Sequence, residues 1–201
     1  MDDSGATRSS DVRSSDVWAS DVSLSLVEGA LLIGGHCRVE QRLFELTGRW
    51  SVDAAGGRDP LGLADFLATQ SAIHGWRLAE WERRSPRSIG EPEAGDDTGW
   101  DLALDVADSI QTDRARLACW YQVLAVHLAA RYRRHLAVTS RAADAGVARW
   151  LSIAQSDVLD GVAHGATVAA RHDTSDDSGP PATEVADAVA ACLVPLLEHG
   201  F

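Results

Sequence analysis

The sequence contains no lysine and no asparagine, so all 18 of its basic side chains are arginines. Against them stand 30 acidic residues, which gives a formal net charge of −12 at pH 7. Nucleic-acid-binding proteins gain affinity by neutralising phosphates, and an anionic membrane surface also attracts basic residues. The charge balance therefore argues against nucleic acid and against a membrane surface as partners.

Cysteine is scarce as well, and Cys37, Cys119 and Cys192 lie far apart with no Cys-x-x-Cys pair. We therefore expect buried, inert thiols and neither a disulfide framework nor a zinc ribbon. The chain has no apolar run of about 18 residues, and its first residues lack the basic-then-apolar pattern of a secretory signal. Together these absences predict a cytoplasmic protein.

The common signatures of catalysis are missing too. The sequence has no Gly-x-Gly-x-x-Gly, no phosphate-binding glycine loop, no Gly-x-Ser-x-Gly and no His-Glu-x-x-His. Each of these motifs carries a specific chemistry, from phosphate binding to zinc-assisted hydrolysis. The candidate functional residues are therefore the ionisable residues that interrupt the apolar faces of the predicted helices.

Apolar residues recur at three- and four-residue steps through most of the chain, and no stretch has the Val/Ile/Thr alternation of a strand. The predicted fold class is all-α. Ser23 is the expected cap of the first helix. We expect long helices over 24–50, 60–84, 109–138 and 142–171, and a shorter helix over 183–200 that Pro195 interrupts.

The loops predict how these helices are organised. Residues 1–22 repeat Ser-Asp-Val and are too polar to order themselves, so we expect a disordered N-terminal arm. Residues 23–171 form the predicted four-helix bundle, and 172–201 a linker with the C-terminal helix. An irregular acidic connection over 85–108, with one short turn near 100–106, is long enough to return along the bundle. This predicts a ferritin-like bundle with a long crossover between helices 2 and 3, although an up-down-up-down bundle with an ornamented loop also fits.

Two ionisable residues interrupt the apolar faces of the first two predicted helices. Glu40 lies between His36 and Leu43, in the middle of an apolar stripe, and His74 lies seven residues from both Leu67 and Trp81. A buried carboxylate needs a partner, a proton or a metal. Glu40 is therefore a candidate ligand or acid/base group, or else the ion-pair partner of an arginine such as Arg77. His74 is a second candidate ligand, or else a hydrogen-bonded core histidine.

The fourth predicted helix carries the densest group. Asp157 lies three residues before Asp160 and seven before His164, so all three share one face. Aspartate is a poor helix former, which suggests a compensating role. Asp157 therefore joins Glu40 and His74 as a candidate catalytic residue, and these three with His164 form the candidate metal ligands.

Other side chains are expected to line or flank the interior. Tyr121 and His127 fall on the apolar face of the third predicted helix and, with Trp76, form the candidate substrate-binding residues. The group Arg131, Arg133, Arg134 and His135 is expected to be solvated and to compensate the helix dipole.

The sequence does not decide whether the protein binds a metal. A dinuclear carboxylate centre in a bundle uses Glu-x-x-His, whose spacing directs both ligands to one metal pair. Neither Glu-x-x-His nor Asp-x-x-His occurs in the chain. Iron and no cofactor are therefore equal alternatives.

A resemblance to a known group rests on three segments: EQRLFEL at residues 40–46, QSAIHGW at 70–76, and YRRHL at 132–136. Over residues 26–170 the chain resembles a group of uncharacterised actinobacterial helical proteins of the ferritin-like superfamily. That superfamily includes di-iron oxidases, hydroxylases and iron stores. The resemblance implies a helical bundle with its chemistry in the interior.

Two functions follow as hypotheses. The first is a small ferritin-like enzyme that acts on a small organic substrate inside the bundle, by metal-dependent oxidation or hydroxylation or by acid–base catalysis. The second is a metal-free bundle that binds a ligand or a partner, in which the apolar run 188–194 covers the bundle or forms a homodimer. Convergence of Glu40, His74, Asp157 and His164 on one point would favour the enzyme, whereas separate salt bridges would favour the binding protein.

Overall fold

The computed structural model describes residues 24–56, 62–85, 97–175 and 182–199. Nearly all of these residues are helical, and no strand occurs among them, which confirms the all-α prediction. The predicted N-terminal arm lies outside the described residues. No described helix is both long enough and apolar enough to cross a membrane.

The chain forms the following helices in order: α1 (Leu26–Ala55), α2 (Leu63–Arg84), α3 (Thr98–Asp108), α4 (Asp113–Cys119), the π-helical turn η1 (Trp120–Leu124), α5 (Ala125–Val138), α6 (Ala145–Ser175) and α7 (Ala182–His199).

The helix boundaries follow local chemistry. Ser25 and Glu28 make a reciprocal capping box at the start of α1, with the Ser25 hydroxyl accepting from the Glu28 amide at 3.2 Å and the Glu28 carboxylate accepting from the Ser25 amide at 2.8 Å. The expected cap at Ser23 was therefore wrong by two residues. Gly62, with a φ of 76°, precedes α2 in the left-handed region that glycine adopts at little cost.

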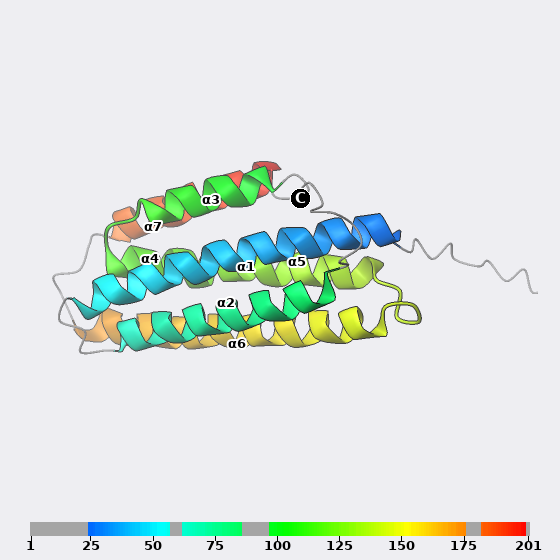
Figure 1. Ribbon diagram of the computed structural model, residues 1–201. Coiled ribbons are helices and arrows are strands. Elements are labelled where there is room, and N and C mark those ends of the chain that lie inside the picture. Colours follow the sequence, from blue (N-terminus) through cyan, green and yellow to red (C-terminus); the bar gives the residue numbers. More distant parts are fainter. Residues whose placement is uncertain (1–23, 57–61, 86–96, 176–181, 200–201) are drawn as a thin grey trace, which may run out of the picture.

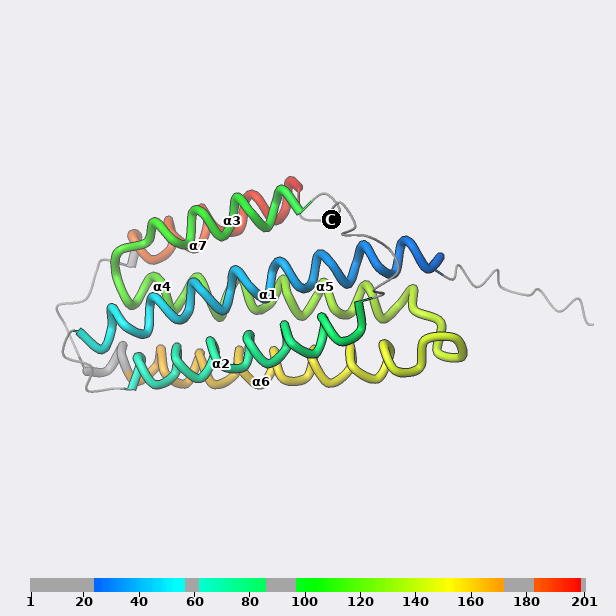
Figure 2. Tube along the Cα trace, in the orientation of Figure 1, coloured from blue at the N-terminus to red at the C-terminus, as the bar shows by residue number. Residues whose placement is uncertain are grey.

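The helices pair along the long axis of the molecule (Figures 1 and 2). α1 lies beside α2, α5 lies beside α6, and α2 also contacts α6. α3 and α7 lie side by side over α1 and α4. The colours show that α2 and the α4–α5 segment run in the same direction, whereas α1, α3 and α6 run in the opposite one.

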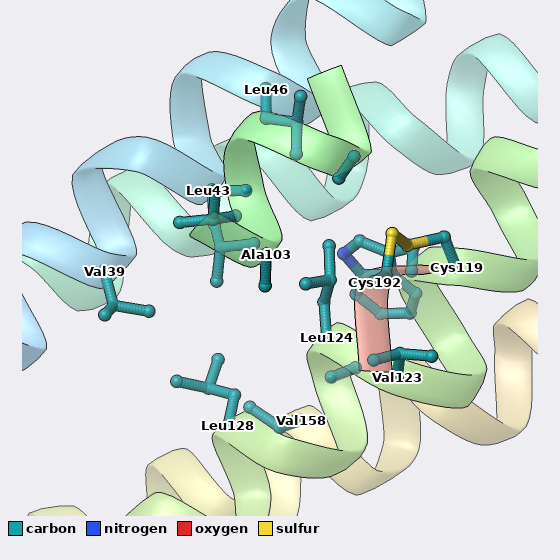
Figure 3. Packing of buried hydrophobic residues seen from close by; sticks show 14 of the residues in the cluster. Val39, Leu43, Leu46, Ala103, Cys119, Val123, Leu124, Leu128, Val158 and Cys192 are labelled. Atoms are coloured by element: carbon teal, nitrogen blue, oxygen red, sulfur yellow. A yellow bond between two sulfur atoms is a disulfide. The ribbon is translucent and has the colours of Figure 1, made fainter. Parts of the chain in front are cut away.

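The apolar faces meet in one continuous core. Val39, Leu43 and Leu46 of α1 face Leu124 and Leu128, and Ala103 of α3 closes the same core (Figure 3). All six of these side chains are buried. Burial of this kind contributes roughly 1.5–3 kcal/mol per large apolar side chain, and it fixes the helices that carry the polar residues described below.

Two predicted segments differ from the structure. Residues 98–108, expected to be part of an irregular connection, form α3, whose buried face includes Trp100, Ala103 and Leu104. The expected single helix over 109–138 begins only at Asp113 and contains η1, where the hydrogen bonds widen for five residues. Such π turns have no periodicity signal of their own, and they are frequent at functional sites.

Pro195 does not interrupt α7, which was expected to break there. Proline removes one hydrogen bond to the carbonyl four residues earlier, here that of Ala191. Ala191 is exposed, so water can satisfy its carbonyl and the helix continues to His199.

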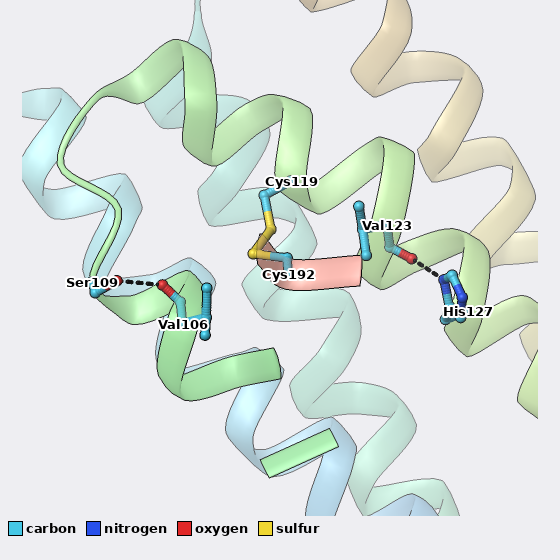
Figure 4. Close-up of a disulfide and its surroundings, with 6 residues drawn as sticks. All are labelled: Val106, Ser109, Cys119, Val123, His127 and Cys192. Atoms are coloured by element: carbon cyan, nitrogen blue, oxygen red, sulfur yellow. Dashed lines mark hydrogen bonds between the residues drawn. A yellow bond between two sulfur atoms is a disulfide. The ribbon is translucent and has the colours of Figure 1, made fainter. Parts of the chain in front are cut away.

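The prediction of three inert thiols was wrong for two of them. Cys119 at the end of α4 and Cys192 of α7 form a disulfide that joins two parts of the chain 73 residues apart (Figure 4). The pair becomes visible only when α7 packs against α4, which no local pattern indicates. Cys37 is the one free cysteine among the described residues, and burial raises its pKa to about 11, as expected for an inert thiol.

Candidate functional site

A buried carboxylate lies at the centre of the bundle. Glu40 of α1 has no exposed surface, and both of its oxygens are bonded. Oε2 lies 2.5 Å from Nδ1 of His74, Oε1 accepts from Nε of Arg77 at 2.8 Å, and the hydroxyl of Tyr132 also donates to Oε1. Trp81 Nε1–H donates to the same hydroxyl at 3.2 Å. We name these five residues the Glu40 cluster.

The Glu40 cluster is held by charge compensation. Burial alone would raise the pKa of Glu40, but Arg77, His74 and the Tyr132 hydrogen bond together bring it below its ordinary value. Burial would lower the pKa of Arg77, but Glu40 outweighs this effect and raises it. Burial and the Glu40 charge raise the pKa of Tyr132 well above its ordinary value. The ion pair therefore stays charged, and the hydroxyl stays protonated.

The protonation of His74 follows from its neighbours. Burial lowers the pKa of His74, so the ring is neutral. Nδ1 lies 2.5 Å from the Glu40 carboxylate and 3.0 Å from Nη2 of Arg77, which can only donate. The shorter contact, to a carboxylate, assigns the ring proton to Nδ1 and leaves Nε2 as an acceptor. Nε2 has no hydrogen-bond partner among the described residues, and neither has Nη1 of Arg77. Both side chains are 1% exposed, so the Glu40 cluster ends in two buried polar atoms with nothing bonded to them.

The His74 ring packs against Trp120 of η1, and Trp120 in turn lies close to α6. The ring of Trp120 lies edge-on to His74 with centroids 6.4 Å apart, and its own Nε1 is also without a partner in the described part of the chain. Gly161 of α6 permits this close approach, because a Cβ there would lie 3.0 Å from Trp120 and 3.1 Å from Oε1 of Gln70. The glycine therefore lets α6 approach Trp120 and Gln70 closely.

A second buried polar cluster adjoins the Glu40 cluster, with the His36 ring centroid 4.6 Å from that of Trp81 and 4.9 Å from that of Tyr132. Nε2 of His36 lies 2.9 Å from Nδ1 of His135, and Arg131 donates from Nε to Nδ1 of His36 at 3.2 Å. Arg131 also donates from Nη1 to Asp97 at 2.6 Å. We name His36, His135, Arg131 and Asp97 the His36 cluster. Because His36 accepts from Arg131, it must donate to His135, so the direction of each hydrogen bond is fixed.

Neither histidine of the His36 cluster is charged. Burial, followed by Arg131 and His135, holds the pKa of His36 well below its ordinary value, and burial with Arg131 lowers that of His135 to about 4. Arg131 and His135 were expected to be solvated, which was wrong: His135 is 4% exposed and Arg131 pairs with Asp97. Only Arg133 and Arg134 of that group are exposed.

The structure brings together only part of the predicted site. Glu40 and His74 are in contact, and Arg77 is the partner of Glu40 that the sequence offered as the alternative to a metal. Asp157 is half-buried and contributes an electrostatic attraction to Arg77. His164 is exposed and stacks edge-on against Phe66, and Asp160 is also exposed.

The predicted lining residues lie outside the Glu40 cluster. Trp76 is 47% exposed and packs against Trp150. The Tyr121 hydroxyl accepts from Gln122 at 2.7 Å, and His127 bonds from Nδ1 to the backbone oxygen of Val123 at 3.0 Å (Figure 4). These contacts give each residue a local partner.

The residues present do not fit a metal centre. Within the described ranges, no three His, Cys, Asp or Glu side chains are grouped so that they could hold a metal ion. Both oxygens of Glu40 are already bonded, and the guanidinium of Arg77 takes the place that a cation would need. Glu40, His74 and Arg77 therefore form an ion-pair network and not a set of iron ligands.

Sequence reasoning missed Tyr132, Trp81 and His135 as members of these clusters. Tyr132 and His135 continue the apolar stripe of Leu124 and Leu128 at four- and three-residue steps, so periodicity could have placed them inside. Asp97 had no such signal, because it precedes α3 in a stretch rich in Asp and Gly. Comparison with protein-family models, curated proteins and solved structures finds no match to this chain.

Proposed function

We propose that this protein is a metal-free helical bundle that binds a small polar molecule in its interior, next to His74 and Arg77. The single observation that carries the proposal is the pair of buried, unbonded atoms at the end of the Glu40 cluster, His74 Nε2 and Arg77 Nη1. A buried polar atom without a partner costs about 1–3 kcal/mol, so native proteins rarely leave such atoms unbonded. A bound molecule that bonds to both would remove that cost.

The two atoms also specify the chemistry of the ligand. Arg77 Nη1 is a donor and requires an acceptor oxygen or nitrogen on the molecule. His74 Nε2 is an acceptor and requires a donor, such as a hydroxyl or an amide N–H. Glu40 already balances the charge of Arg77, so a neutral molecule with one donor and one acceptor fits better than an anion.

The proposal includes the ferritin-like arrangement, with the connection between α2 and α4 as the crossover. The parallel direction of α2 and the α4–α5 segment supports this topology, since two hairpins joined by a crossover require it. The net charge supports a small-molecule ligand over nucleic acid. α7 buries Cys192 and Leu196 within its own chain, so the apolar run at 188–194 already has a covering role.

Nuclear magnetic resonance of protein labelled with ¹⁵N-histidine tests the proposal. Without ligand, the His74 ring should give the signature of the Nδ1–H tautomer. Titration with acetamide, a small neutral probe with both a donor and an acceptor, should then shift the Nε2 resonance of His74. His127 of α5, bonded to the backbone carbonyl of Val123 in η1, is the internal control, and its resonances should not shift.

A pair of glycine variants gives the test a second arm. Gly161→Ala places a methyl group against Trp120 and Gln70 and should weaken acetamide binding by about tenfold. Gly146→Ala, on the same helix with nothing within 4 Å, should leave it unchanged. A His74 resonance that does not shift when acetamide is added, or an equal loss of acetamide binding in both variants, would contradict the proposal.

Acid–base catalysis on the bound molecule is a second candidate function. It is favoured by the 2.5 Å contact between Glu40 and His74, because a carboxylate that holds one imidazole nitrogen orients the other for proton transfer. Hydrolysis of an activated ester by the wild type and by His74→Gln tests it. Equal rates in the two proteins would leave binding as the function.

A further inference from the structure

A hollow of about 260 Å³ lies where α5 ends and α6 begins, remote from His74 in the sequence and lined by none of the Glu40 cluster. Its lining combines the apolar side chains of Leu136, Ala145 and Ala148 with the polar ones of Arg141, Arg149 and Ser152. Drug-sized ligands occupy roughly 300–1,000 Å³, so this hollow suits a smaller molecule.

The two arginines of this hollow have no ion-pair partner among the described residues, and both are exposed. A second hollow, of about 580 Å³ at the far end of α1, provides the comparison. There Arg49 pairs with Asp108 at 2.8 Å and Arg116 with Asp53 at 3.0 Å. The arginines of the larger hollow are therefore already neutralised, whereas those of the smaller one are available to an anion.

The charge around the smaller hollow is opposite to that of the chain as a whole. Residues 125–152 contain five arginines and one acidic residue, Asp144, although the full sequence carries a net charge of −12. An anion bound between Arg141 and Arg149 would offset this local excess of positive charge.

We infer that this hollow binds a small organic anion. A carboxylate of the ligand lies between the guanidinium groups of Arg141 and Arg149, which bind carboxylates through charge-assisted hydrogen bonds. A short apolar portion of the ligand lies on Leu136, Ala145 and Ala148. The site differs from the proposed interior site in place and in ligand charge, and neither depends on the other.

Calorimetric titration at about 50 mM salt tests the inference with butyrate, acetate and butyramide as probes. Butyrate should bind with a Kd below about 1 mM, and butyramide, the neutral isostere, at least about tenfold more weakly. Acetate should also bind more weakly than butyrate, because it lacks the apolar portion. Failure of butyrate to bind, or equal affinities for butyrate and butyramide, would overturn the inference.

Single arginine variants locate the site. Arg141→Gln and Arg149→Gln should each weaken butyrate binding by about tenfold. Arg133→Gln is the matched control, since Arg133 is an exposed arginine of the same basic segment outside the hollow. An equal loss in Arg133→Gln would mean that the charge of the whole segment attracts the anion, and it would overturn the assignment to the hollow.

Discussion

The Glu40 cluster and the His36 cluster adjoin at the rings of Trp81, Tyr132 and His36, and they compensate their buried polar groups in different ways. The His36 ring lies 4.6 Å from the Trp81 ring, and the Tyr132 ring lies 5.7 Å from it. In the Glu40 cluster a full negative charge is matched by the full positive charge of Arg77. In the His36 cluster the two imidazoles stay neutral, and the charges of Arg131 and Asp97 pair nearer the surface.

The comparison teaches which perturbation each cluster resists. A matched ion pair tolerates changes of pH but not the loss of one partner, because the other charge is then buried alone. A neutral histidine pair tolerates a missing charge but not protonation, because the incoming proton places a cation in a buried position. The two clusters should therefore respond to different experiments.

Removal of the Arg77 guanidinium should cause the largest loss of stability. Arg77→Met keeps most of the side-chain volume but leaves the Glu40 carboxylate unpaired, which should lower the free energy of unfolding by about 3–5 kcal/mol. Urea denaturation measures it. The double variant Arg77→Met/Glu40→Gln should recover at least half of the loss, and a double variant as unstable as the single one would contradict charge compensation.

The second-largest loss of stability is expected from acidification, which acts on the His36 cluster. The pKa of His135 falls from 6.5 in the unfolded chain to about 4 in the fold, so the unfolded state binds the proton more readily and stability is lost as pH falls below 6.5. At pH 5 this histidine alone should cost about 2 kcal/mol. Urea denaturation at pH 7.5 and pH 5 should show the loss.

The lowered pKa of His74 makes the Glu40 cluster lose some stability in the same pH range, so a variant is needed to isolate the contribution of His135. The pKa of Glu40 is lowered from 4.5, so its contribution declines only in more acidic solution. A His135→Gln variant should therefore lose less stability than the wild type between pH 7.5 and pH 5. If His135→Gln loses as much stability as the wild type over this pH range, residues other than His135 cause the loss.

Tyr132→Phe should have a smaller effect, on the Glu40 cluster. It removes the hydrogen bond to the carboxylate and leaves Trp81 Nε1–H without an acceptor, so we expect a loss of about 1.5 kcal/mol. Tyr121→Phe is the control, because that half-buried hydroxyl only accepts from a neighbouring glutamine, and it should change stability by less than about 0.5 kcal/mol. Thermal or urea unfolding of both variants compares them.

Gly35→Ala should have the smallest effect, on the His36 cluster. A Cβ at Gly35 would lie 2.3 Å from Nη2 of Arg131, which Asp97 and His36 hold in place, so the guanidinium must move. After the gain in helix propensity, a net loss of about 1 kcal/mol is expected. Gly29→Ala, with nothing within 4 Å on the same helix, should instead stabilise by up to about 1 kcal/mol. Equal stabilisation by both variants would mean that Arg131 is not held.

Periodicity alone determined much of the fold. The apolar steps through α1, α2 and α6 placed those helices to within a few residues, because each packs one face against the core and keeps that face along its length. The same reasoning put Glu40 and His74 inside, since both interrupt an apolar stripe. It also offered Arg77 as the partner of Glu40, because a buried carboxylate needs a compensating charge.

Only the tertiary structure decided which inward residues meet. Asp157 and His164 share a face in the sequence pattern, yet α6 leaves His164 exposed and holds Asp157 only near Arg77. Tyr132, His135 and Asp97 reach their partners, and Cys119 reaches Cys192, across sequence separations that no local pattern encodes. Spacing along one helix fixes a direction around its axis, whereas a contact between helices also depends on their mutual rotation and axial shift, which the packing of the whole core sets.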